Sequence, residues 1–169
     1  MTTLVSRPYR RAKWQSICLA ALGLWLSASL VFDFLIVPSL FASGMMESSN
    51  FASFSYLVFG NFNHLELLGA AIILGSSLAI NYRHNFSSIK LDSSLVVSSL
   101  LMAIALVYTY FLTPQMSALG MNLDQFGAQE LPGNLMIGAH IAYWVLEISK
   151  LALGTFLLSK VYGNSCELQ

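Results

Sequence analysis

The sequence predicts an all-α integral membrane protein, a bundle of four transmembrane helices built from two repeated helical hairpins. Of its 169 residues, 56% are hydrophobic and 9% are charged, whereas an ordinary soluble domain carries about 25% charged residues. A chain this short cannot bury such an apolar excess in a water-soluble core, because small domains leave much of their surface exposed. Four successive apolar segments are each long enough for a span, which needs ~20 residues.

The four predicted spans lie at about residues 17–37, 62–82, 91–112 and 135–161. None of them alternates apolar with polar residues, as a strand of a membrane barrel would, so helices are expected. The first apolar segment is longer than the core of a cleaved signal peptide. We therefore treat residues 1–169 as one membrane domain.

Proline and polar residues predict where the helices end. Pro38 and Pro114 are expected to end the first and third spans, since proline lacks the backbone N–H that continues a helix. Residues 48–63 are dotted with Ser and Asn, and we expect a short helix on the membrane surface there. Residues 122–133 are expected to form a loop before the fourth span.

The cations predict the orientation of the bundle. Seven of the eight Lys and Arg residues fall before the first span, in the second loop or after the fourth span: Arg7, Arg10, Arg11, Lys13, Arg83, Lys90 and Lys160. Cytoplasmic loops carry such an excess of cations, so both termini are expected to be cytoplasmic, or stromal in an organelle. We expect a bacterial inner membrane or a thylakoid membrane. The partner is the lipid bilayer, and the net charge of zero gives no indication of nucleic acid.

An internal repeat is the most informative pattern. Residues 38–45 match residues 114–121 at an offset of 76 residues, with Pro, Ala, Gly and Met shared, and His64 falls on His140 without a gap. Two hairpins, residues 14–82 and 90–162, would then be copies related by an axis along the membrane normal. In that case the two histidines occupy equivalent positions.

His64 and His140 are the first candidate ligands. Imidazole binds haem iron, copper and zinc, and cofactor sites of bundles are built between facing helices. Haem b or a copper ion held by the pair is therefore one hypothesis, with Asp33 and Tyr108 as possible neighbours at similar depth. The alternative for each histidine is an interfacial residue bonded to a carbonyl, a Ser or a lipid headgroup. The alternative for Asp33 is a neutral carboxyl bonded to a Ser or Tyr of another helix.

Three further charged residues lie inside the spans. Glu147 and Lys150 stand at i, i+3 and are expected to form an intramembrane ion pair, with a proton or ion path as the sharper alternative. Glu66 lies two residues from His64, nearly opposite on a helix, so both cannot face one ligand.

Several of these residues carry a family resemblance. The segments 32–42 and 111–116, with His140, are similar to a family of small four-helix membrane proteins of unassigned function, which includes a eukaryotic transmembrane protein linked to cisplatin resistance. That family resembles a branch of the copper-resistance-D-like superfamily, which also holds a haem-binding protoporphyrinogen oxidase. The resemblance implies a four-helix fold and an association with metal or haem. The first span lacks the histidine that the oxidase has there.

Three functions remain open at this point. The first is a haem- or copper-binding protein with an electron-transfer, metal-handling or assembly role. The second is a cofactor-free accessory subunit of a larger membrane complex, which would have other membrane subunits or a second copy as partners. The third is a small efflux or uptake protein. No P-loop, dinucleotide fingerprint, nucleophile elbow or HExxH motif is present, so an enzyme is not the favoured class.

Overall fold

A computed structural model describes residues 6–44, 51–82, 92–126 and 133–166, and all secondary structure in these ranges is helical. Four of its helices are long and apolar enough to cross a membrane, at Lys13–Leu40, Ser53–Asn81, Ser93–Leu119 and Ile137–Gly163. The prediction of an all-α membrane bundle with four spans is confirmed. Arg83 and Lys90, which entered the orientation prediction, lie outside the described residues.

The first and third spans each consist of three helical pieces. The first comprises α1 (Ser6–Val31), the π-helical turn η1 (Phe32–Ile36) and α2 (Val37–Ala42), and the third comprises α4 (Ser93–Val107), the π-helical turn η3 (Tyr108–Leu112) and α5 (Thr113–Phe126). The second and fourth spans are the single helices α3 (Phe51–Tyr82) and α6 (Gly133–Cys166).

The prediction that Pro38 and Pro114 end their spans is wrong, because a π-helical turn precedes each proline. Val37 donates its N–H to the carbonyl of Phe32 and Thr113 donates to Tyr108, so the hydrogen bonds skip one extra residue. In a regular α-helix, a proline ring clashes with the carbonyl group of the residue four positions earlier. The wider π-helical turn moves that carbonyl group away from the ring. The helix therefore continues through each proline.

Two other boundaries also differ from expectation. The region expected to form a surface helix is continuous with the second span, since α3 begins at Phe51 and runs on to Tyr82. Residues 122–126, expected to belong to a loop, are helical because α5 continues to Phe126, and the rest of that expected loop up to residue 132 lies outside the described residues. In both places no proline interrupts the chain, and Pro132 is the first strong helix breaker after α5.

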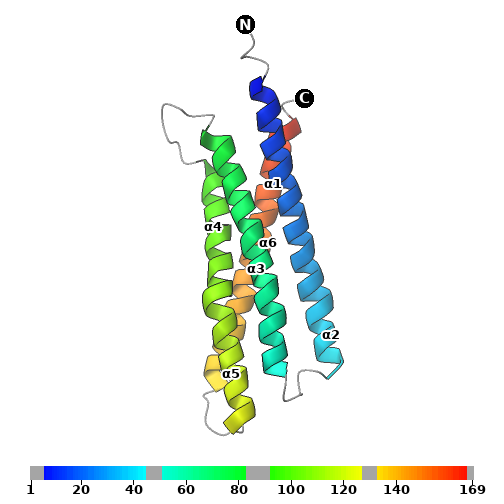
Figure 1. Cartoon of the computed structure of the whole chain (residues 1–169), viewed down its shortest axis with the longest axis vertical. Coiled ribbons are helices and arrows are strands. Elements are labelled where there is room, and N and C mark those ends of the chain that lie inside the picture. Colours follow the sequence, from blue (N-terminus) through cyan, green and yellow to red (C-terminus); the bar gives the residue numbers. More distant parts are fainter. Residues whose placement is uncertain (1–5, 45–50, 83–91, 127–132, 167–169) are drawn as a thin grey trace.

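The helices form an up-and-down bundle with both chain ends at one end of the molecule (Figure 1). α1 adjoins α3 and α6, and α4 adjoins the same two helices. Over their described lengths, α3 and α6 have no Cα atoms within 8 Å of each other, and neither have α1 and α4. These two pairs are therefore the diagonals of the bundle.

The half of the bundle nearer the termini contains a layer of buried apolar side chains, together with buried polar residues such as Ser77 and Ser98. Leu22, Ile73, Leu101 and Leu157 come from the four different spans and are fully buried. We call these four residues the apolar layer. The outward faces carry exposed residues such as Leu24 and Leu68, as expected for helices that meet lipid tails. The apolar layer packs the four spans together on the side of the termini.

Candidate functional site: a buried charged cluster

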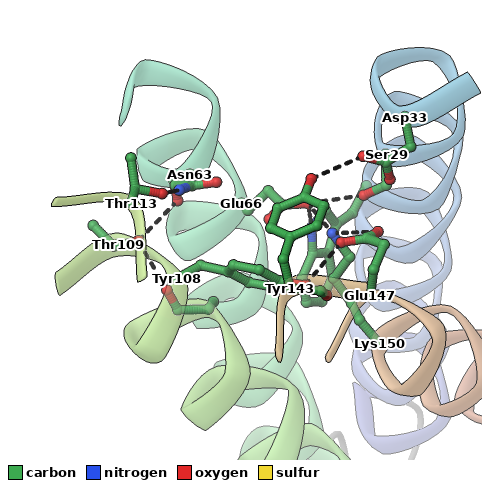
Figure 2. A network of polar contacts seen from close by, with 12 residues as sticks. Ser29, Asp33, Asn63, Glu66, Tyr108, Thr109, Thr113, Tyr143, Glu147 and Lys150 are labelled. Carbon is green, nitrogen blue, oxygen red and sulfur yellow. Dashed lines mark hydrogen bonds and ion pairs between the residues drawn. The ribbon is translucent and has the colours of Figure 1, made fainter. Parts of the chain in front are cut away.

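A lysine lies at the centre of the bundle between two glutamates (Figure 2). The Nζ atom of Lys150 is 2.6 Å from Oε1 of Glu66 and 2.8 Å from Oε1 of Glu147, and each of these side chains is 3% exposed. Glu66 belongs to α3, whereas Glu147 and Lys150 belong to α6. The lysine side chain thus connects α6 to α3, two helices whose backbones are not in contact.

Glu66 is held by donors from α1. The indole Nε1 of Trp25 donates to Oε1 of Glu66 at 3.0 Å, and the hydroxyl of Ser29 donates to the same oxygen at 2.8 Å. Trp25 and Ser29 are four residues apart, so they lie on one face of the helix. With Lys150, three donors converge on this oxygen.

Two tyrosines connect the second carboxyl group to a third. The hydroxyl of Tyr108 lies 3.1 Å from Oε2 of Glu147 and 3.0 Å from the backbone oxygen of Tyr143. The hydroxyl of Tyr143 donates to Oδ1 of Asp33 at 3.0 Å. Lys150 Nζ also lies 5.3 Å from the centre of the Tyr108 ring, within the range of a cation–π interaction.

The charge of this cluster does not balance. Among the described residues, the buried ones of charged type are Asp33, Glu66, Glu147 and Lys150, three carboxyls and one ammonium. An isolated buried ion is so unfavourable that the group usually becomes neutral instead. Two carboxylates that share a site cannot both ionise readily. The cluster therefore has the composition of a site that takes up a proton or a small cation.

A second cluster of polar side chains connects η3 and α5 to α3 by hydrogen bonds. The side-chain amide of Asn63 donates to the hydroxyl of Thr113 at 2.5 Å. The hydroxyl of Thr109 lies 2.8 Å from the carbonyl oxygen of Ala105 and 3.3 Å from that of Asn63. Figure 2 shows this group beside the charged cluster. Its donors and acceptors are neutral and paired, so its role is to position η3.

The two histidines lie on the second and fourth spans. His64 is exposed on α3, and its Nδ1 donates to the carbonyl oxygen of Gly60 at 2.6 Å. His140 is exposed on α6, on the helix face that also carries Tyr143 and Glu147. Haem or copper binding by this pair stays a prediction.

The described residues contain no group of three His, Cys, Asp or Glu side chains arranged to hold a metal ion. The residues proposed as neighbours of the histidines, Asp33 and Tyr108, instead contact Tyr143 and Glu147. Tyr110, which has the same depth as Tyr108, is exposed.

Sequence reasoning missed four members of the cluster. It had Glu147 and Lys150 together, but it did not join Glu66 to them or assign any role to Trp25, Ser29 and Tyr143. A signal was present on α6, where Tyr143, Glu147 and Lys150 are spaced at i, i+4 and i+7 and so share one face. A similar spacing places Trp25, Ser29 and Asp33 on one face of the first span.

Comparisons of the chain with protein-family models, with curated proteins and with solved structures find no match. The fold and the cluster define the class to which the chain belongs, a four-span helical membrane protein with buried ionisable groups in its core.

Proposed function

We propose that this protein moves protons across an energised membrane and that the charged cluster is the group that binds and releases them. The observation that carries the proposal is the convergence of two buried carboxyls, Glu66 and Glu147, on one buried ammonium, with the third buried carboxyl, Asp33, bonded to Tyr143 of the same network. This develops the transport hypothesis based on Asp33, Glu147 and Lys150, and it adds Glu66.

Burying the charged cluster is energetically unfavourable, and this supports a functional role. Ionisable groups inside membrane spans are expensive and commonly mark ion or proton pathways. Replacing a buried ion pair by well-packed apolar residues is often neutral or stabilising. The bundle already has an apolar layer that packs its four spans. A charged layer next to it is therefore better explained by proton binding than by stability.

The two hairpins are proposed to be copies of one ancestral hairpin, with both termini on the cytoplasmic side. The position of the π-helical turns supports the duplication, because Phe32–Ile36 and Tyr108–Leu112 are separated by the same 76 residues as the two prolines. The distribution of cations supports the orientation. A fluorescent-protein fusion at the C-terminus should be fluorescent, whereas a periplasmic reporter fused there should be inactive.

Proton movement is tested with purified protein in liposomes that contain a pH-sensitive dye. A potassium gradient with valinomycin makes the interior negative, and we expect the protein to acidify it faster than in protein-free liposomes. Glu147→Gln should lower this rate at least about tenfold, the size of effect that a barrier rise of ~1.4 kcal/mol produces. A wild-type rate equal to that of protein-free liposomes would contradict the proposal.

Lys160 provides a matched control for Lys150, because both lysines belong to α6. Lys160 lies near the terminal end of the helix and pairs with Asp92 at 2.9 Å, and its side chain is 28% exposed. Lys160→Met removes the same charge from the same helix outside the cluster, so the proton flux should stay at the wild-type level. Lys150→Met should lower it. Equal effects of both substitutions would show that the cluster has no special part in the flux.

A further inference from the structure

The ammonium group of Lys150 has the surroundings of a bound cation. Its Nζ atom lies 2.6 Å from Oε1 of Glu66 and 2.8 Å from Oε1 of Glu147, and all three side chains are 3% exposed. The hydroxyl of Ser29 lies 2.8 Å from the same Glu66 oxygen, and the centre of the Tyr108 ring lies 5.3 Å from Nζ. Two carboxyl oxygens, a nearby hydroxyl and an aromatic face therefore surround one positive charge.

The contact with Glu147 depends on charge more than on the direction of a hydrogen bond. Its Oε1 atom lies 2.8 Å from Nζ, yet it accepts no hydrogen bond from the described residues. A metal ion makes undirected contacts of this kind, and small hard cations take carboxylate and hydroxyl oxygens as ligands. A potassium ion has the same charge as an ammonium group and nearly the same radius. The position of Nζ is therefore suited to an alkali cation, and the lysine already fills it.

The covalent attachment of Lys150 makes this occupant permanent. The side chain belongs to the middle of α6, and the residue is buried in the core. An alkali cation that entered would displace the ammonium from both carboxyls, and a buried charge without its partner is strongly unfavourable. A proton does not meet this obstacle, because it binds to a carboxyl oxygen as an O–H group and needs no coordination shell.

We propose that Lys150 determines the cation specificity of the charged cluster. Its ammonium group excludes alkali cations from the position between Glu66 and Glu147 and leaves the carboxyl oxygens able to bind a proton. This inference deepens the proposed function, on which it rests, because it names the residue that makes the site selective for protons.

Potassium binding to Lys150→Ala tests this specificity. The substitution removes the ammonium and most of its chain, so a potassium ion should bind between the two carboxyls. Purified protein in detergent is titrated with potassium chloride, while choline chloride keeps the ionic strength constant. At a potassium concentration about ten times the dissociation constant, the unfolding temperature of Lys150→Ala should rise by about 4 °C. An unfolding temperature of this variant that does not depend on potassium would overturn the proposal.

Two substitutions serve as matched controls. Lys150→Met removes the charge but keeps an unbranched side chain of similar length, so no space opens between the carboxyls and no stabilisation by potassium is expected. Lys160→Ala removes an ammonium from the end of α6 near the termini, where the side chain is partly exposed, and should show no stabilisation either. A rise in either control equal to that of Lys150→Ala would overturn the assignment to the ammonium position.

Propylammonium is the part of the lysine side chain that alanine lacks, and it provides a chemical rescue. It should stabilise Lys150→Ala and shift the potassium titration to higher concentrations, because both cations compete for one position. Stabilisation by potassium that propylammonium leaves unchanged would overturn the proposal.

A measurement on wild-type protein keeps the proposal falsifiable if Lys150→Ala does not fold. Equilibrium dialysis with radioactive rubidium, a chemical substitute for potassium, should find no saturable binding to wild-type protein. Saturable binding that Glu66→Gln abolishes would overturn the exclusion. Potassium binding by Lys150→Ala without proton flux in the wild type would defeat the proposed function alone, and flux without that binding would defeat this inference alone.

Discussion

The two π-helical turns occupy corresponding positions in the first and third spans, yet they are held very differently. The third span packs closely on α3, since η3 and α5 both adjoin that helix, and they also adjoin α6. The first span packs on α3 and α6 through α1, but its Cα atoms from η1 onward lie more than 8 Å from both helices. A π-helical turn therefore occurs both in the third span, which packs closely on its neighbours, and in the first span, whose backbone lies farther from them.

The side chains of the two turns explain the difference. Phe32, the first residue of η1, reaches α3 with its ring, which stacks on Phe62 with centroids 4.1 Å apart and meets the edge of Phe59 at 5.0 Å. Tyr108, the first residue of η3, adds a hydroxyl that enters the charged cluster. The second residues are Asp33 and Thr109, and only the aspartate brings a charge. The comparison indicates that η3 contributes a tyrosine hydroxyl to the charged cluster and that η1 contributes a carboxyl.

The largest effect in this comparison is expected when the attachment of η1 is removed. Phe32→Ala should lower the free energy of unfolding by about 2 kcal/mol, because each aromatic pair contributes ~0.5–1.5 kcal/mol. It should also speed hydrogen exchange of the η1 amides, measured by mass spectrometry in detergent. Phe34→Ala is the control, since Phe34 is 67% exposed. Equal effects at the two positions would remove the contrast between the turns.

A smaller effect is expected when η3 loses a hydrogen bond but keeps its packing. Tyr108→Phe should lower the free energy of unfolding by about 1 kcal/mol, within the range found for hydrogen bonds between membrane helices. The ring stays in place, so hydrogen exchange in η3 should change little. Tyr110→Phe changes a residue that is 59% exposed and should have no measurable effect on thermal unfolding. A larger loss from Tyr110→Phe than from Tyr108→Phe would contradict the assignment of Tyr108 to the cluster.

The smallest effect is expected at the far end of α4, away from both turns. Lys160 donates to Asp92 at 2.9 Å and holds the pKa of that carboxyl below its usual value. A lowered pKa stabilises the fold above the unfolded value of about 4, and this stabilisation is lost as the pH falls through the folded value. Because the pair is partly exposed, its contribution should stay below about 1 kcal/mol.

Asp92→Asn measures that contribution. Thermal unfolding of the variant and the wild type should differ slightly at neutral pH and converge in acid. A difference that grows in acid would show that the sign is wrong. The result also gives a reference value for a solvent-exposed charge pair, against which substitutions in the charged cluster can be compared.

The sequence predicted the four spans well because their signal is local. Each apolar segment identifies itself by length and hydropathy, independently of its neighbours. The expected helix ends at Pro38 and Pro114 were wrong because a helix can continue through a proline that follows a π-helical turn. No residue pattern in the sequence predicted these turns. Asp33, Glu147 and Lys150 stood out because charges inside spans are rare. Their link to Glu66 crosses a diagonal of the bundle, which depends on the order of helices in space.

The histidines show a different limit. The repeat suggested that His64 and His140 were equivalent, but an offset in sequence does not fix which way a side chain faces. On α3 the inward face belongs to Asn63, Glu66 and Ala70, which are buried, and His64 lies outside it. In a lipid-exposed helix the outward face is also apolar, so the usual contrast between core and surface residues gives little guidance.

The apolar layer has an electrical consequence. A membrane potential falls mainly across the part of the protein that excludes water and ions, and here that part includes Leu22, Ile73, Leu101 and Leu157. Under the proposed function, a proton that passes between the charged cluster and the termini crosses this layer and gains or loses up to about 2.3 kcal/mol per ~100 mV. A membrane potential should therefore change the rate of that passage.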